Sequence, residues 1–413
     1  MHFGSIEDAV ADIRAGRMVI VVDDEDRENE GDFIMAAEKC ALDAMATMIR
    51  HGSGIVCVPT TGARLRELDI PMMVRSNTSR LGTAMAVTVD ARSGTTTGVS
   101  AADRVATVRV LHDPSSRPSD LTRPGHIVPL RAEDGGVLKR AGHTEAAVDL
   151  CTMAGLRPVG VLCEVMNDDG TMARLSQLWS FAERLGLRIV TIADLIAYRR
   201  RTERLITRVA STSMPTRSYG VFAVHAYEST VDPYPAVALV KGDISGEEPV
   251  LVRVHSSCFT GDLLESLRCD CGDQLHMALS LIAETDRGVL IYLQQEGRGI
   301  GMVNKIRAYE LQDHGADTVQ ANERLGFKPD LRDYGIGAQI MVDLGLRRIR
   351  AITNNPAKIA GIAGYGLEVV GTVPVAAPAN AHNVRYLRTK VEKLGHAICV
   401  VDNPETGRQQ TAG

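Results

Sequence analysis

Three cysteines stand close together in the second half of the chain. Cys258, Cys269 and Cys271 lie within fourteen residues, although the 413 residues include only eight cysteines. An odd number of thiols cannot pair completely in disulfides, whereas three thiolates can hold a tetrahedral ion and leave its fourth position to water or substrate, as in catalytic zinc sites. The spacing differs from the paired motifs of structural zinc fingers. The sequence therefore favours a catalytic zinc site over a structural zinc site or unliganded thiols.

A second candidate site is the acidic run from Asp23 to Asp32, which places seven carboxylates in ten residues. It follows an apolar stretch, residues 18–22, that we expect to form a short buried strand. A solvated acidic turn is one interpretation. The other is a magnesium site, because Mg²⁺ prefers oxygen ligands and α/β sheets present ligand sites at strand ends.

Two short segments share the order arginine, any residue, glycine, histidine. They are Arg123–His126 and Arg140–His143, and each presents a cation and an imidazole across a glycine. A single surface histidine usually has no special role, but the repetition within a short distance favours a site. After the second segment, Thr144 is predicted to cap the N-terminus of a helix.

Two other positions could contribute to the same site. Glu164 lies inside the apolar run V-L-C-E-V, where a carboxylate is costly to bury unless it is paired, liganded or protonated. It is therefore a candidate general acid or base with a raised pKa. The three hydroxyls of Thr95 to Thr97, between two glycines, could hold a phosphate or could form a turn.

The second half also carries a glycine-rich loop, Glu296 to Lys305, after an expected buried strand at residues 289–293. Strand, glycine loop and helix in this order, with Arg298 and Lys305 present, could bind a triphosphate through backbone amides and cations. The Walker motif is missing, which excludes a P-loop NTPase. Asp273 is predicted to cap the helix that follows the cysteines.

Composition and charge narrow the class of protein. Hydrophobic residues make up 45 % and charged residues 23 %, as in globular proteins, and the net charge of −5 argues against non-specific nucleic-acid binding. The N-terminus has neither the basic nor the apolar region of a signal peptide, and no apolar run reaches the length of a membrane span. We expect a cytoplasmic enzyme with no membrane or nucleic-acid partner. The five dispersed cysteines are expected to be reduced core residues.

The length and the order of elements predict an α/β (α+β) chain of two domains, each a mixed sheet packed with helices. A basic run near residue 205 separates domain 1–204 from domain 205–400, and residues 401–413 read as a disordered tail. In the second domain, residues 220–226, 236–241 and 250–255 alternate between apolar and polar, which predicts antiparallel strands.

The first domain resembles 3,4-dihydroxy-2-butanone 4-phosphate synthase. The resemblance rests on D-D-E-D-R-E-N-E-G-D, T-T-T-G-V-S, R-P-G-H-I-V-P-L-R, R-A-G-H-T-E-A-A-V-D-L and the strand with Glu164. It implies that Glu28 and His143 bind Mg²⁺ or Mn²⁺ and that Asp32, His126 and Glu164 are catalytic. The residues that it implies for ribulose 5-phosphate are Arg27, Glu28, Asp32, Arg140, Ala141, Gly142, His143, Thr144 and Glu164.

The second domain resembles GTP cyclohydrolase II, through R-C-D-C-G-D-Q-L, E-G-R-G-I-G, D-T-V-Q-A-N, D-Y-G-I-G-A-Q-I and T-N-N-P-A-K. The resemblance implies zinc on the three cysteines and proton transfer by Tyr309 and Asp330. It gives Arg332 a nucleophilic role on the α-phosphate, although a protonated guanidinium is more simply a charge clamp on pyrophosphate. The residues that it implies for GTP are Arg253, Val254, His255, Ser256, Ser257, Gln274, Glu296, Gly297, Arg298, Thr318, Thr353 and Lys358.

These resemblances predict a fused enzyme of riboflavin biosynthesis that acts on ribulose 5-phosphate and on GTP, and they suggest a homodimer. Two departures from the family pattern border the nucleotide site: Ser257 replaces an expected glutamate and Gln294 an expected arginine. Three alternatives stay open. Only one half could be active, the chain could sense GTP through a structural zinc domain, or the GTP reaction could stop after ring opening.

Overall fold

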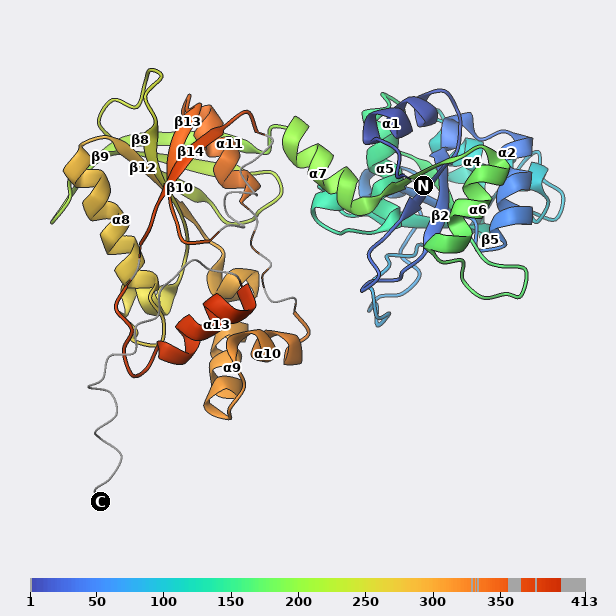
Figure 1. The fold of residues 1–413 in the computed structure, drawn as a ribbon. Coiled ribbons are helices and arrows are strands. Elements are labelled where there is room, and N and C mark those ends of the chain that lie inside the picture. Colours follow the sequence, from blue (N-terminus) through green and yellow to red (C-terminus); the bar gives the residue numbers. More distant parts are fainter. Residues whose placement is uncertain are drawn as a thin grey trace. The chain divides into compact units, whose positions relative to one another are not determined.

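The computed structural model describes residues 2–327, 330, 332, 334–355, 365–375 and 377–394. The chain divides into two compact units, Met1–Thr202 and Glu203–Gly413 (Figure 1). Each unit contains a seven-stranded sheet with both parallel and antiparallel neighbours, and helices pack on it. The predicted fold class is therefore confirmed. The expected tail at residues 401–413 lies outside the described residues.

The sheet of the N-terminal unit has the order β4-β5-β3-β6-β2-β1-β7. Its central strands are antiparallel, because β2 pairs in this direction with both β1 and β6, whereas β1 with β7 and β3 with β5 are parallel pairs. The strands are β1 (Val19–Val22), β2 (Gly31–Ala36), β3 (Cys57–Thr61), β4 (Val89–Ala91), β5 (Leu121–Ala132), β6 (Gly160–Glu164) and β7 (Arg188–Thr191).

Alternate residues of these strands fill two cores, one on each face of the sheet. On β2, Phe33 and Met35 belong to one core and Ile34 to the other, as the two-residue period of a strand requires. Helices α2, α4 and α6 close the first core, and α1, α5 and α7 close the second. The helices are α1 (Ile6–Arg14), α2 (Leu42–Thr47), α3 (Gly62–Glu67), α4 (Ala101–His112), α5 (His143–Met153), α6 (Leu175–Leu185) and α7 (Ile192–Thr202).

The sheet of the C-terminal unit has the order β14-β13-β11-β12-β10-β9-β8. The predicted antiparallel pairing is correct for β9 and β10 but wrong for β11, which runs parallel to both β12 and β13. Strand β8, which was not predicted, pairs antiparallel with β9. Alternation of residue types does not report strand direction. The strands are β8 (Ile206–Thr216), β9 (Gly220–Ser229), β10 (Ala236–Lys241), β11 (Val250–Ser256), β12 (Gly288–Leu293), β13 (Arg348–Ile352) and β14 (Glu368–Val373).

The parallel half of this sheet provides a place for a site. Strands β11 and β12 end side by side, so the loops that follow them lie next to each other at the same edge of the sheet. Helices α9, α10 and α13 gather beyond these strand ends (Figure 1). The helices described here are α8 (Cys271–Thr285), α9 (Gly301–Asp313), α10 (Thr318–Arg324), α11 (Gly335–Asp343) and α13 (Val384–Leu394). In the described part of the chain, every helix is too short or too polar to cross a bilayer.

Candidate functional sites

The three predicted zinc ligands come together beyond the end of β11. Cys258 follows that strand, while Cys269 and Cys271 stand at the start of α8. Their sulfur atoms all lie within 4.8 Å of one another, and the Sγ atoms of Cys258 and Cys269 are 3.6 Å apart. Two sulfurs at about 2.3 Å from one tetrahedral zinc would be about 3.8 Å apart. The donor set and its spacing therefore fit this ion.

The thiols of this cluster differ in acidity from an ordinary buried cysteine. Hydrogen bonds with Cys269 and Cys271 lower the pKa of Cys258, and Lys305 acts in the same direction. The hydrogen bond with the Cys258 thiolate raises the pKa of Cys269 to about 11. At Cys40, in contrast, burial, assisted by the nearby Asp43 carboxylate, raises the pKa to about 12, which keeps the thiol inert. Of the dispersed cysteines, Cys40, Cys57, Cys151 and Cys163 are buried and free, and Cys399 lies outside the described residues.

The turn after Cys258 is shaped by an aspartate that sequence reasoning missed. The Asp262 carboxylate accepts hydrogen bonds from the Cys258 amide at 2.9 Å and the Tyr292 hydroxyl at 2.8 Å, and His255 Nε2 lies 3.1 Å away. Gly261 allows the sulfurs to approach, since a Cβ there would lie 2.9 Å from the Cys269 sulfur. The T-G-D sequence that begins two residues after the first cysteine was an available signal for this turn.

Lys305, which the sequence offered as a triphosphate contact, lies beside the cysteine cluster. Its Nζ donates hydrogen bonds to Cys258 Sγ at 3.0 Å, Thr260 Oγ1 at 2.8 Å and Glu296 Oε1 at 2.6 Å. Glu296 also accepts from the Phe259 amide at 2.8 Å. The glycine loop turns α9 so that this lysine neutralises charge at the thiolates. It contacts a candidate metal ligand, and a phosphate contact by this lysine, which also lines the pocket with Arg298, stays a prediction.

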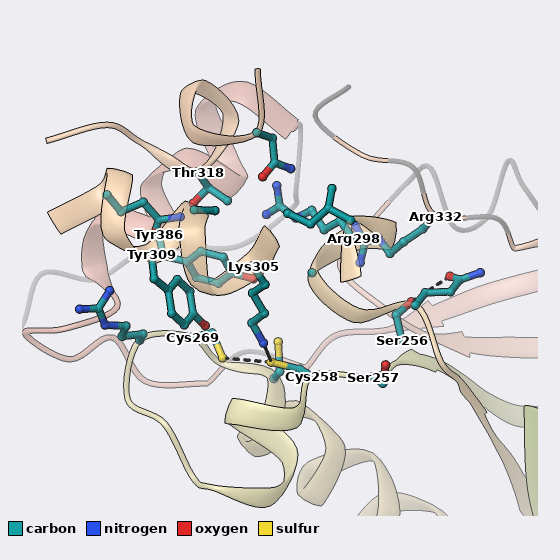
Figure 2. A pocket seen from close by; sticks show the side chains of 18 residues that line it. Ser256, Ser257, Cys258, Cys269, Arg298, Lys305, Tyr309, Thr318, Arg332 and Tyr386 are labelled. Atoms are coloured by element: carbon teal, nitrogen blue, oxygen red, sulfur yellow. Dashed lines mark hydrogen bonds between the residues drawn. The ribbon is translucent and has the colours of Figure 1, made fainter. Parts of the chain in front are cut away.

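A pocket opens from the cysteine cluster toward two arginines. In Figure 2, Lys305 points at Cys258, Tyr309 stands beside Cys269, and Arg298 and Arg332 lie on the other side. The Tyr309 hydroxyl is 3.2 Å from Thr260 Oγ1, and burial raises its pKa. The pocket therefore joins a soft-metal site to a cationic region. Its described lining includes the predicted Ser256, Ser257, Gly297, Arg298, Thr318, Tyr309 and Arg332.

The other predicted nucleotide residues divide into four groups. Glu296 lies outside the described pocket linings and pairs with Lys305. Arg253, His255, Gln274 and Thr353 line a second pocket that shares Ser256, Cys271, Arg298, Arg332 and Tyr386 with the first. Val254 lines neither pocket and is buried in the sheet, because it alternates with Arg253 and His255 along β11. Lys358 lies outside the described residues.

Asp330 forms an ion pair with Arg332. Its carboxylate accepts from Arg332 Nε at 2.8 Å and Nη2 at 2.5 Å. Burial acts to raise the pKa of Asp330, but the arginine lowers it, and the pairing raises the pKa of Arg332 against the effect of burial. The guanidinium thus stays charged, which suits a clamp on phosphate. Proton transfer by Asp330 remains a prediction. The ion pair with Arg332 would hold the Asp330 carboxylate in a fixed position.

The N-terminal unit carries a second group of residues that could hold a metal ion, Asp23, Glu28 and His143, whose candidate ligand atoms lie within 4.8 Å of one another. Glu28 Oε2 is 3.5 Å from His143 Nδ1, and this pairing lowers the pKa of Glu28 to about 2 against the effect of burial. Asp23 was not predicted as a ligand. Its oxygens accept from the Glu28 and Glu30 amides at 3.0 and 2.9 Å, so it shapes the acidic turn.

Strand register brings distant predicted residues to the same end of the sheet. Asp32 on β2 is the cross-strand partner of Glu164 on β6. Burial raises the pKa of Asp32 to about 7, opposed by His143 and assisted by Glu164. Glu164 Oε2 accepts from the Ile55 amide at 2.8 Å. The side chain of His126 does not join this group in the described residues; its Nδ1 lies 2.7 Å from Asp90 Oδ2.

The second arginine–glycine–histidine segment packs tightly beside the acidic turn. Arg27 pairs with Asp23 and Glu28, and Arg140 Nη1 donates to Glu145 at 2.7 Å. A Cβ on Gly142 would lie 2.4 Å from Arg140 Nη1 and 3.0 Å from Arg27 Nη2, so a larger residue here would displace the ends of these two side chains. These contacts bring the predicted substrate residues Arg27, Glu28, Arg140, Gly142 and His143 together, while Ala141 is exposed and Thr144 buried.

Two local predictions need correction. Thr144 is not a cap, because α5 begins at His143 with Gly142 as its N-cap, and Asp273 is not a cap, because α8 begins at Cys271 with Asp270 before it. Both helices therefore start at a candidate metal ligand, where the helix dipole favours negative charge. Of the two interpretations for residues 95–97, the turn is favoured. Thr95 Oγ1 donates to the Ala91 carbonyl and Thr96 Oγ1 to Asp103.

Comparison with known proteins agrees with this division. The 3,4-dihydroxy-2-butanone 4-phosphate synthase family matches residues 7–198, and the GTP cyclohydrolase II family matches residues 207–374. Riboflavin biosynthesis protein RibBA of Nocardia farcinica is 55 % identical over 98 % of this chain and 99 % of its own. RibBA of Aquifex aeolicus is 54 % identical over 95 % and 98 %.

A solved structure covers both units. The crystal structure of RibBX, a two-domain 3,4-dihydroxy-2-butanone 4-phosphate synthase from A. baumannii, is 36 % identical, with a TM-score of 0.69 over 91 % of this chain and all of that chain. Fold and sites define a two-domain enzyme that joins a synthase to a cyclohydrolase. The chain belongs to the RibBA family of bifunctional riboflavin biosynthesis proteins.

Proposed function

We propose that the N-terminal unit converts D-ribulose 5-phosphate to L-3,4-dihydroxy-2-butanone 4-phosphate and formate. The C-terminal unit hydrolyses GTP to 2,5-diamino-6-ribosylamino-pyrimidinone 5′-phosphate, formate and pyrophosphate. One observation carries the proposal: each unit holds its own metal-ligand cluster, with hard oxygen and nitrogen donors in the first and thiolates in the second. Two donor sets of different softness suit two metals and two reactions.

The N-terminal site is proposed to bind Mg²⁺ or Mn²⁺ through Glu28 and His143. Such an ion stabilises negative charge on the oxygens of an enediolate. Asp32 has a carboxyl pKa near 7 and can accept or donate a proton at neutral pH. Glu164 and His126 are proposed to serve the later proton transfers. Arg27 and Arg140 supply positive charge for the substrate phosphate.

The C-terminal site is proposed to bind Zn²⁺ through its three cysteines, which leaves one coordination position open. A zinc ion held by these cysteines would lower the pKa of a bound water and would supply a nucleophile for hydrolysis at neutral pH. Arg298 and Arg332 hold the phosphates, and Arg332 stabilises the leaving pyrophosphate. Tyr309, beside Cys269, donates a proton to the opening ring. We further propose a cytoplasmic homodimer.

The proposal is tested by giving the purified chain each substrate separately, GTP with Zn²⁺ and ribulose 5-phosphate with Mg²⁺. Mass spectrometry should detect the two named products, and a formate assay should give one formate per substrate in each reaction. Unchanged GTP after prolonged incubation would contradict the cyclohydrolase half and favour a nucleotide-sensing domain. A ring-opened product that keeps its formyl group would show an arrested reaction.

One other candidate function is a one-sided enzyme that has only the synthase activity. Ser257 lines the pocket at the position of an expected glutamate, and the name of RibBX mentions the synthase activity alone. Under this candidate, ribulose 5-phosphate is consumed while GTP is not. If so, Ser257→Glu should restore part of the GTP reaction, and its failure to do so would exclude that position as the cause.

Replacing Lys305 by methionine is expected to slow the GTP reaction by about 10–100-fold, the usual effect of removing a partner of a metal ligand. Cys258 would lose its charged donor, and Glu296 would be left without this cation. Steady-state kinetics and the thiolate-to-cobalt absorption of Co²⁺-loaded protein measure the effect. The ribulose reaction of the same sample is the control. Unchanged GTP kinetics with an unchanged cobalt spectrum would contradict the role.

A further inference from the structure

A buried aspartate stands between two of the metal ligands. Asp270, between Cys269 and Cys271, is 1 % exposed, and neither carboxylate oxygen faces water. One oxygen lies 2.6 Å from Lys390 Nζ and the other accepts from Gln274 Nε2 at 2.6 Å. Burying a carboxylate is costly unless such partners compensate it. The turn that carries two of the three thiols is therefore fixed through this side chain.

Lys390 comes from a distant part of the chain. It lies on α13, 120 residues from Asp270 and beyond residues 207–374, where the cyclohydrolase family matches. Lys390 is itself buried, and its ammonium lies 4.8 Å from the ring of Tyr386, one helical turn away. Tyr386 lines both pockets of the unit. The inward face of α13 is thus part of the wall of the site.

The contact continues into the sheet. Gln274 Oε1 accepts from Arg253 Nη2 at 2.7 Å, and Arg253 Nη1 donates to the Ile352 carbonyl at 2.9 Å. Lysine, aspartate, glutamine and arginine form one buried chain of hydrogen bonds from α13 through the start of α8 to β11 and β13. In such a network the loss of one member leaves the others unsatisfied.

We infer that Lys390 is a positioning residue for the metal ligands: its ion pair with Asp270 holds the Cys269–Cys271 turn in the geometry that the ion requires. The inference rests on the proposed metal role of the three cysteines. Partners outside the ligand sphere typically change metal affinity by about 10–100-fold. Without the ammonium, the buried carboxylate is uncompensated and the turn relaxes toward water.

Simple electrostatics predicts the opposite change in metal affinity when Lys390 is removed, which makes the inference testable. An ammonium near the cluster repels a divalent cation, so its removal would strengthen metal binding if charge alone mattered. A phosphate-binding role for Lys390 would change the KM for GTP and leave metal affinity unchanged. Metal affinity measured without nucleotide separates these three cases.

The experiment compares Lys390→Met with Lys393→Met in the full chain. Lys393 lies on the same helix but forms an exposed ion pair with Asp317, so it is a matched control. Zinc affinity is measured by competition with a chromophoric chelator, and geometry by the absorption spectrum of the Co²⁺ form. We expect Lys390→Met to bind zinc about 10–100-fold more weakly and to change the cobalt spectrum. The control should match the wild-type chain.

A second variant guards against a failure to fold. Lys390→Gln keeps a hydrogen-bond donor at the Asp270 carboxylate and should lie between wild type and Lys390→Met in zinc affinity. Equal or tighter zinc binding by folded Lys390→Met or Lys390→Gln, with the wild-type cobalt spectrum, would overturn the inference and leave the proposed function intact. A wild-type chain that binds no zinc would overturn both.

Discussion

Replacing Cys269 by serine is expected to remove the metal from the C-terminal unit and to abolish the GTP reaction, while the ribulose 5-phosphate reaction continues. A hydroxyl is a poor ligand for a soft ion, and two thiolates cannot hold the tetrahedral geometry that three provide. Since outer partners already change activity by about 10–100-fold, loss of a ligand should exceed about 100-fold. Metal content and formate release from each substrate measure the result.

A matched control is available for this substitution. Cys40 is a buried, free cysteine of the N-terminal unit, and its sulfur belongs to a hydrophobic core rather than to a metal cluster. Cys40→Ser should keep one zinc per chain and both reactions. If Cys269→Ser retained its zinc, or if the folded variant lost both activities, the independent-site picture would be wrong.

Replacing Glu28 by glutamine should have the converse effect. The exchange preserves the size of the side chain but removes a charge that His143 and Arg27 hold ionised at neutral pH. The site then lacks a carboxylate for a hard divalent ion, and ribulose 5-phosphate turnover should fall by more than about 100-fold, with GTP turnover unchanged. Product formation over a series of Mg²⁺ concentrations measures both the rate and the metal requirement.

A substitution at the neighbouring Glu25 is the control that distinguishes the loss of a metal ligand from the loss of negative charge in the acidic turn. It lies in the same acidic turn but is exposed, so Glu25→Gln should leave the ribulose reaction nearly unchanged. Comparable losses in the two variants would mean that the acidic turn acts through its total charge. Full activity of Glu28→Gln would remove this residue from the metal site.

Residue types and local spacing were sufficient for the main chemical predictions. Cys258, Cys269 and Cys271 lie close in sequence, so their convergence needs only a turn and a helix start. The mixed α/β architecture also followed from sequence, because buried strands and amphipathic helices leave periodic patterns. Helix starts were less accurate: α5 begins at His143 and α8 at Cys271, since a capping preference is weak when tertiary contacts fix the chain.

Only the tertiary structure showed which side chains from distant parts of the sequence contact the candidate ligands and their neighbours. Lys305 lies 47 residues from Cys258 and Lys390 lies 120 residues from Asp270, yet both pairs are in contact. Glu164 meets Asp32 only through the antiparallel register of two strands. Periodicity reports how a segment is buried, whereas strand order and helix packing determine which segments meet. The sequence by itself thus determined the fold class and predicted the candidate ligands, because both depend on local patterns, and the tertiary structure decided which charges surround each site.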